Sequence, residues 1–228
     1  MNLSYRIAWL GFRLLFRCYF RYRVYHAERV PAEGAVLLAS NHSSFLDPPL
    51  IGSCTSRAIH FLARDTLFKI PGFAHVLRSW NTVPVDREGG GPAGLKTMLD
   101  LLKNDDAVIV FPEGTRSRDG NMQPPRSGIG LLTVKSNAPV VPVRVFGTYD
   151  AFGRHMRFPR PRRVAVTFGP PLDLSVLKAE AASCSKSRLK EVYREIAVAV
   201  MNAIAGLEPR LDCPHLALKN SSDSNGKP

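Results

Sequence analysis

The chain has 228 residues, of which 45% are hydrophobic and 22% charged, a composition typical of a globular protein with one well-formed core. Its 31 Lys and Arg residues against 19 Asp and Glu give a net charge of +12, which favours an anionic partner. The four cysteines are scattered, without a Cys-x-x-Cys pair or a cluster at ligand spacing, so the sequence predicts no metal site. We interpret them as reduced thiols, which favours a protein facing the cytosol.

The first segment, residues 1–30, is apolar and rich in arginine. Arg6, Arg13 and Arg17 interrupt the apolar run, so it is too polar for a transmembrane helix, and no signal-peptide cleavage site follows. At 100° per residue these three arginines fall within about 40° of one another, and Trp9 belongs to the apolar remainder. We expect a helix in the membrane interface, peripheral or monotopic, on the cytoplasmic face of a membrane. The alternative is a helix packed on the protein's own core.

From about residue 34 onward, short apolar runs rich in β-formers alternate with helical patterns. The expected strands cover residues 35–40, 58–63, 82–85, 107–111, 140–146 and 164–168. The helical patterns cover residues 92–102, 129–134 and 189–204. This alternation predicts one α/β domain over residues 31–207, with a mostly parallel central sheet flanked by helices. The polar residues 208–228 are expected to form a disordered tail.

Residues 41–47 (NHSSFLD) directly follow the first apolar strand of this domain. A histidine becomes a useful base at neutral pH when a carboxylate orients its ring, and His42 and Asp47 offer that pair. Five residues of helix rotate by about 500°, so the two side chains meet only if a turn precedes the helix. Pro48 and Pro49 favour such a turn. The equally weighted alternative is that Asp47 caps a helix and His42 is an ordinary loop residue.

Residues 111–117 (FPEGTRS) follow another apolar strand and form a loop that contains a glycine. Gly114 allows the backbone to approach a ligand closely. Backbone amides, the Thr115 hydroxyl and the Arg116 guanidinium would together suit a phosphate. Glu113 could accept a hydrogen bond from a substrate hydroxyl or could position Arg116. The alternative is a tight surface turn that contains an internal ion pair.

Two further segments lie at or near strand ends. Arg87 follows the strand over residues 82–85 and could clamp one phosphate together with Arg116, since strand-end charges converge in α/β folds. The alternative for Arg87 is a surface ion pair, which contributes little. Val141 and Pro142 belong to a buried strand by composition and line an apolar groove at most.

A second cluster of arginines lies between residues 154 and 163, without an acidic residue among them. Its members are Arg154, Arg157, Arg160, Arg162 and Arg163. An apolar or aromatic residue interleaves them, which favours an interaction surface over a merely solvated face. The alternative function for the whole chain is therefore a catalytically silent protein that binds anionic lipids through its two arginine clusters.

Four segments, in this order, resemble the sequence blocks of the glycerolipid acyltransferases, specifically the bacterial-type 1-acylglycerol-3-phosphate acyltransferases. The segments are residues 41–47, 85–87, 111–117 and 141–143. The resemblance implies that His42 is the catalytic base and that Asp47 orients it. By the same resemblance, the glycerol phosphate of the acceptor is bound by Arg87, Glu113, Gly114 and Arg116. Residues 125–128 read Pro-Arg-Ser-Gly where Phe-Lys-x-Gly is common in that family.

The resemblance implies transfer of an acyl chain to lysophosphatidic acid at a phospholipid membrane surface, giving phosphatidic acid. The donor would be acyl-CoA or an acyl-carrier protein, either of which suits a basic protein, and no cofactor is expected. Another lysolipid acceptor is the alternative within the same chemistry. We expect no nucleic-acid partner. Nucleic-acid binding would explain the net charge but not the motifs at the strand ends, and the sequence contains no recognised nucleic-acid-binding motif.

Overall fold

Helices and strands alternate along the chain in this computed structural model, which describes residues 3–85 and 91–209. The strands are β1 (Arg23–Tyr25), β2 (Val36–Ser40), β3 (Phe61–Arg64), β4 (Thr82–Val85), β5 (Ala107–Val110), β6 (Val140–Phe146) and β7 (Ala165–Phe168). The α-helices are α1 (Leu3–Cys18), α2 (Asp47–Cys54), α3 (Phe73–Ser79), α4 (Pro92–Lys103), α5 (Gly128–Ser136), α6 (Thr148–Phe152), α7 (Ser175–Ser183) and α8 (Lys186–Ala205). Two 3-10 turns are η1 (Ala27–Arg29) and η2 (Asp65–Lys69).

The main sheet has the strand order β1-β7-β6-β2-β5, and every neighbouring pair is parallel except β6 with β7. The expected mostly parallel sheet is therefore confirmed. The strand expected over residues 58–63 begins later, at Phe61, and pairs with β4 in a separate parallel two-stranded sheet. His60 joins the two sheets, because its amide donates to the Ala107 carbonyl at 2.8 Å and its carbonyl accepts from Ile109 at 3.1 Å.

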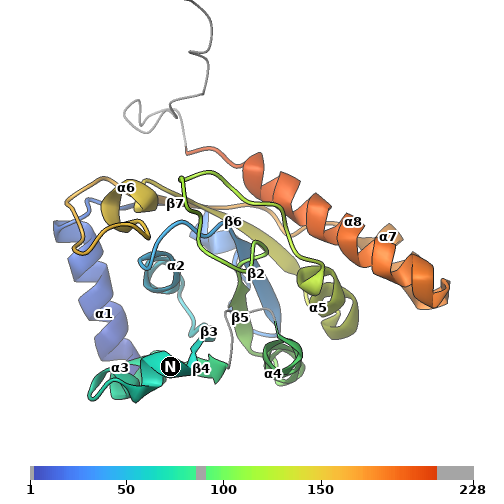
Figure 1. Ribbon diagram of the computed structural model, residues 1–228, viewed down its shortest axis with the longest axis horizontal. Helices are drawn as coiled ribbons and strands as arrows, with labels where there is room; N and C mark the ends of the chain where they lie inside the picture. The colour runs from blue at the N-terminus through green and yellow to red at the C-terminus, as the bar shows by residue number, and fades with distance from the viewer. Residues whose placement is uncertain (1–2, 86–90, 210–228) are drawn as a thin grey trace, which may run out of the picture.

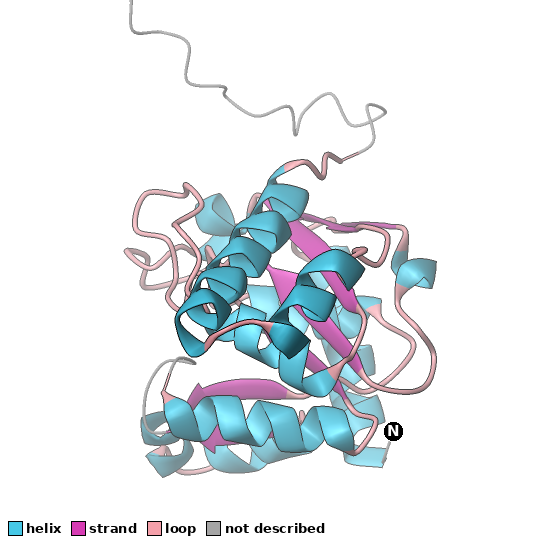
Figure 2. Cartoon of the chain, turned by 90° about the vertical axis from the view of Figure 1, so that its right-hand side faces the viewer, coloured by secondary structure: helices cyan, strands magenta, loops and turns pink. Residues whose placement is uncertain are grey.

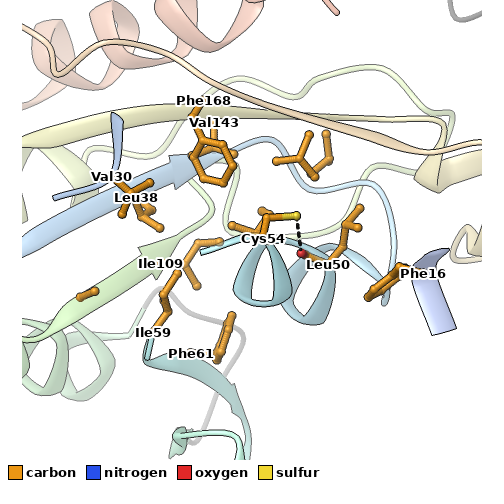
Figure 3. Packing of buried hydrophobic residues seen from close by; sticks show 14 of the residues in the cluster. Phe16, Val30, Leu38, Leu50, Cys54, Ile59, Phe61, Ile109, Val143 and Phe168 are labelled. Atoms are coloured by element: carbon orange, nitrogen blue, oxygen red, sulfur yellow. Dashed lines mark hydrogen bonds between the residues drawn. The ribbon is translucent and has the colours of Figure 1, made fainter. Parts of the chain in front are cut away.

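Helices cover both faces of the main sheet and form two cores with it. Because side chains alternate along a strand, Leu38 and Ile109 pack toward α1 and α2, whereas Leu37 and Val108 pack toward α4, α5 and α8. Figure 2 shows the helices that cover this second face of the sheet, in front of the strands. Figure 3 shows the first core, where side chains of β2, β5 and β6 meet Leu50 of α2. Burial of one such aliphatic side chain contributes about 1.5–3 kcal/mol.

One face of the N-terminal helix α1 packs on this first core. Tyr5 and Phe16 are fully buried, and the Tyr5 ring stacks on that of Trp80 with centroids 4.9 Å apart. The indole N–H of Trp9 donates to the Thr55 carbonyl at 3.0 Å. The position of Trp9 therefore does not support the membrane-interface role expected of it, because its ring lies at the junction with α2 instead of facing outward.

The other side of α1 stays exposed. Arg6, Arg13 and Arg17 are exposed, as the proposed interface role requires, although that role itself stays a prediction. Apolar side chains are exposed beside them: Leu3, Ile7, Leu10 and Leu14. Within residues 3–85 and 91–209, no helix combines the length and the apolar character needed to cross a bilayer. Residues 210–228, most of the expected tail, lie outside the described residues.

Candidate active site

The site is built at the carboxyl end of β2, the strand that lies between β5 and β6. Asn41, the first residue after β2, continues the sheet with its side chain instead of its backbone. Its amide nitrogen donates to the Val145 carbonyl at 3.1 Å, and its amide oxygen accepts from the Val145 amide at 2.8 Å. The backbone is thereby released to turn, and His42 lies at the carboxyl end of a central parallel strand, where open α/β sheets bind their ligands.

His42 and Asp47 make the contact that their spacing leaves open. His42 Nδ1 lies 2.8 Å from Asp47 Oδ2, and the same oxygen accepts hydrogen bonds from the amides of Ser43 and Ser44 at 2.7 Å each. The turn over residues 43–46 brings the two side chains together, because Asp47 is the first residue of α2 and its side chain is completely buried. A carboxylate accepts only, so Nδ1 carries the hydrogen and Nε2 keeps its lone pair for a proton.

The ring of His42 is held from a second direction by Phe111. The two rings stack with centroids 3.9 Å apart and planes 17° from parallel. Since Asp47 fixes the ring edge and Phe111 fixes its plane, the imidazole has little rotational freedom left to lose in a reaction. The side chain keeps 17% of its surface exposed, so a substrate can reach it.

Glu113 holds the backbone of the histidine segment and does not face outward. Its Oε1 accepts from the His42 amide at 2.8 Å, and its Oε2 accepts from the Gln123 amide at 2.9 Å. The residue is only 3% exposed, and this burial raises the pKa of its carboxyl, partly offset by the two amide hydrogen bonds. Both oxygens are therefore used within the protein. In this geometry Glu113 is a positioning residue for the His42 backbone, and the acceptor-binding role expected of it stays a prediction.

Position 114 requires a glycine, because the side chain of another residue passes directly over its backbone. Its φ is +68°, and a Cβ at this position would come within 2.7 Å of the Nε of Arg126. The amide of Arg126 also donates to the Pro112 carbonyl at 2.8 Å, which fixes the arginine beside the loop. Sequence reasoning noted Arg126 only as a departure from a family pattern. Its place shortly after the loop over residues 113–117 was the available signal that it belongs to the site.

Arg116 is brought to the histidine segment by an aromatic side chain. Its guanidinium carbon lies 3.5 Å from the centroid of the Phe45 ring, a cation–π contact between the two predicted segments. Thr115 lies next to it and is half-buried. The structure thus places Arg116 close to residues 41–47. Arg87 lies outside the described residues, so the expected clamp of two arginines stays a prediction.

Val141 and Pro142 lie within β6 beside β2. Val141 is completely buried in the first core, and Pro142 is buried as well, with its carbonyl accepting from Gly169 at 2.7 Å. Packing within the sheet accounts for both residues. We therefore assign them a structural role and do not include them in the surface of an acyl-chain groove.

The family model described as Acyltransferase matches residues 21–146, more than half of the chain, which include β2, β5 and both polar loops. The chain belongs to the acyltransferase family. Its 1-acyl-sn-glycerol-3-phosphate acyltransferase relative from Bacillus subtilis is 32% identical over 126 residues, covering 55% of this chain and 62% of that protein. The alpha form of the same named enzyme from Mus musculus is 30% identical over 191 residues, covering 77% of this chain and 65% of that protein.

A solved structure shares the fold of this acyltransferase. It is the 1-acyl-sn-glycerophosphate (LPA) acyltransferase PlsC from Thermotoga maritima, with a TM-score of 0.64 and 28% sequence identity. The match covers 91% of this chain and 79% of the Thermotoga protein. The aligned regions of the Bacillus and mouse relatives each span less than two thirds of those proteins. The family and the fold are thereby confirmed for this chain.

Proposed function

We propose that this acyltransferase is membrane-associated and moves an acyl chain from acyl-CoA or an acyl-carrier protein to the sn-2 hydroxyl of 1-acylglycerol 3-phosphate, giving phosphatidic acid. The observation that carries the proposal is the buried Asp47 carboxylate, 2.8 Å from His42 Nδ1 at the carboxyl end of a central strand. The names of the relatives from Bacillus subtilis and Thermotoga maritima support this acceptor.

The reaction follows from the orientation of His42. Its Nε2 removes the proton from the acceptor hydroxyl while that oxygen attacks the thioester carbonyl carbon. The tetrahedral intermediate collapses, the carbon–sulfur bond breaks, and the imidazolium returns the proton to the departing thiolate. Asp47 stabilises the imidazolium between these steps and keeps the ring aligned. No cofactor is needed, because the thioester already activates the acyl group.

Arginines around the loop over residues 113–117 would bind the phosphate of the acceptor. Arg116 lies beside the histidine segment, and Arg126 lies across Gly114 with its side chain exposed. A guanidinium presents a planar fork that matches phosphate oxygens, so either residue suits this role. We retain Arg87 as a third candidate on the strength of its sequence position. Gly114 and Thr115 supply backbone and hydroxyl contacts in the same proposal.

Membrane association would bring the enzyme to its acceptor, which is itself a membrane lipid. The exposed arginines and leucines of α1 support a peripheral or monotopic position at the bilayer surface. The cytoplasmic face is the side where acyl-CoA and acyl-carrier protein occur, so we propose that location. The net charge of +12 suits both the anionic lipid surface and either donor.

Mass spectrometry of the products tests the proposal most directly. Purified protein is incubated with a mixture of lysolipids and with each of the two donor types, and His42→Ala serves as the matched control. We expect phosphatidic acid as the main new lipid with the wild type and none above background with His42→Ala. Formation of a different acylated lipid would change the assigned acceptor and leave the proposed acyl-transfer chemistry unchanged. Lipid binding without any acyl product would favour the catalytically silent alternative.

A further inference from the structure

The loop between α6 and β7 carries a concentrated positive charge that the proposed chemistry does not use. Five arginines of this loop are exposed: Arg154, Arg157, Arg160, Arg162 and Arg163. Among residues 3–85 and 91–209, no acidic side chain forms an ion pair with any of them. Phe158 lies in their midst with 71% of its surface exposed. We infer that this arginine loop is a second membrane contact, which binds anionic phospholipid headgroups beside the active site.

The start of the arginine loop is fixed to the histidine segment. The Ser44 hydroxyl donates to the Phe152 carbonyl at 2.7 Å, and Ser44 forms a β-bridge with Gly153. The rings of Phe45 and Phe152 pack with centroids 5.5 Å apart. The loop therefore leaves the fold directly next to the turn between His42 and Asp47. Headgroups bound to this loop would lie close to the catalytic base.

The middle of the arginine loop is fixed to α1. The Tyr19 hydroxyl, just beyond the carboxyl end of that helix, donates to the Pro159 carbonyl at 3.1 Å. Figure 1 shows the loop at the upper end of α1, on the edge of the molecule away from α7 and α8. Since the loop and the helix lie side by side, they can meet one extended surface at the same time.

The exposed side chains of α1 indicate which kind of surface the loop and the helix would meet. Leu3, Ile7, Leu10 and Leu14 are 74%, 63%, 60% and 64% exposed. At 100° per residue they fall within an arc of about 60°, opposite the buried face of the helix. An apolar stripe of this size, adjoined by exposed arginines, fits the acyl boundary of a bilayer. The loop adds Phe158, an exposed apolar side chain among its arginines.

Charge complementarity selects the anionic lipids within that bilayer. Guanidinium groups bind phosphate oxygens in bidentate fashion, and cations near a membrane surface gain from each anionic headgroup. An acidic carrier protein would pair with the arginines but would leave the leucine stripe and Phe158 without an apolar partner. The membrane is therefore the occupant that uses all of these features. The inference deepens the membrane association in the proposed function and assigns it a lipid preference.

The experiment compares two variants that each lose four positive charges. The loop variant changes Arg154, Arg157, Arg160 and Arg162 to Gln. The matched control changes Lys103, Lys186, Lys190 and Arg194 to Gln, all exposed residues of α4 and α8. Binding of the full chain is measured on phosphatidylcholine vesicles with and without phosphatidylglycerol. We expect the loop variant to bind the anionic vesicles at least about tenfold more weakly than wild type, and the control variant within about twofold.

The same comparison contains the outcomes that overturn the inference. Equal binding of the loop variant and wild type, or equal losses in both variants, would remove the specific role of the loop. A loop variant that keeps vesicle binding but loses affinity for an acidic acyl-carrier protein would assign the loop to the donor instead. Circular dichroism checks that each variant is folded, which the exposed positions favour.

A second measurement places Phe158 without removing any charge. In Phe158→Trp, we expect quenching by brominated phosphatidylglycerol vesicles above that of wild type, whose own Trp9 and Trp80 provide the baseline. No added quenching would contradict membrane contact by the loop. Vesicle binding is independent of turnover, so the His42→Ala variant should bind like wild type. If wild type binds as expected but transfers no acyl group, the proposed function fails while the membrane contact stands.

Discussion

His42 and His60 each lie beside an aspartate, at opposite ends of the parallel strands. His42 follows the carboxyl end of β2, whereas His60 bridges to residues at the amino end of β5. The His42 pair is 2.8 Å apart and its aspartate is completely buried. His60 Nε2 lies 3.5 Å from Asp106, whose side chain is 38% exposed. The two pairs share their chemistry but not their surroundings.

The surroundings explain why only the first pair suits a general base. His42 is held through its ring, its amide and its carbonyl, the last accepting from Ser117 at 2.8 Å. His60 has a buried Nδ1 without a hydrogen-bond partner among the described residues, and burial lowers the pKa of its imidazole, with Asp106 partly offsetting the change. A histidine beside an aspartate is therefore not a candidate active site by itself. The position of the pair at the carboxyl end of a strand and the hydrogen bonds to its backbone distinguish the His42 pair.

The largest expected effect separates the two histidines directly. His42→Ala should lower kcat by roughly 10³-fold, because it removes the group that we propose accepts the proton in the transition state. His60→Ala should keep kcat within a few-fold of wild type, since His60 lies at the other end of the strands. Steady-state acyl transfer to lysophosphatidic acid measures both. Comparable losses in the two variants would contradict the distinction between the pairs.

The next effect tests the aspartates. Asp47→Asn should lower kcat by roughly 10²-fold with little change in KM, because in the proposed mechanism Asp47 orients the base and stabilises the imidazolium without binding the acceptor. Asp106→Asn provides the matched change in the other pair, and its kcat should stay within about twofold of wild type. Kinetics with saturating donor distinguish the two parameters. A rise in KM alone for Asp47→Asn would assign that residue to acceptor binding.

A smaller effect tests the backbone support of His42. In Glu113→Gln the side-chain amide nitrogen faces a backbone amide, so one buried hydrogen bond is lost, costing about 1–3 kcal/mol of unfolding free energy. We expect kcat to fall by roughly tenfold as the His42 backbone loosens. Glu28→Gln is the control, since its side chain is 74% exposed. Urea unfolding and kinetics check both variants. A change in KM with normal stability would instead assign Glu113 to acceptor binding.

The smallest effect concerns the pH dependence of stability at His60. Because its pKa is lowered in the folded protein, the unfolded chain takes up this proton first as pH falls. Stability is therefore lost as pH falls from the ordinary histidine value of about 6.5 toward the lowered pKa of His60. Between about pH 8 and about pH 5, an interval that brackets this range, the unfolding free energy of His60→Gln should fall less than that of wild type. His75→Gln, at an exposed position, should behave like wild type.

Most of the fold could be predicted from local patterns. The strands β2, β4, β5, β6 and β7 lie within one residue of the expected ranges, because their apolar runs are continuous and short. The family suggested by residues 41–47 and 111–117 is confirmed by the family match. The short strand β1 and the helices α3, α6 and α7 were missed. All four elements are short, and β1 is stabilised by pairing with β7, far along the chain.

The sequence by itself determined the alternation of strands and helices, the arginine clusters and the two polar segments at strand ends. Tertiary structure alone decided that Asp47 turns back to His42, that Glu113 holds backbone amides, and that Trp9 points inward. The physical reason is the sequence separation over which each kind of interaction acts. Periodicity and turn chemistry act over a few residues, whereas the His42–Glu113 contact joins two segments 71 residues apart. Such a contact depends on the register of β2 beside β5, and no local pattern encodes that register.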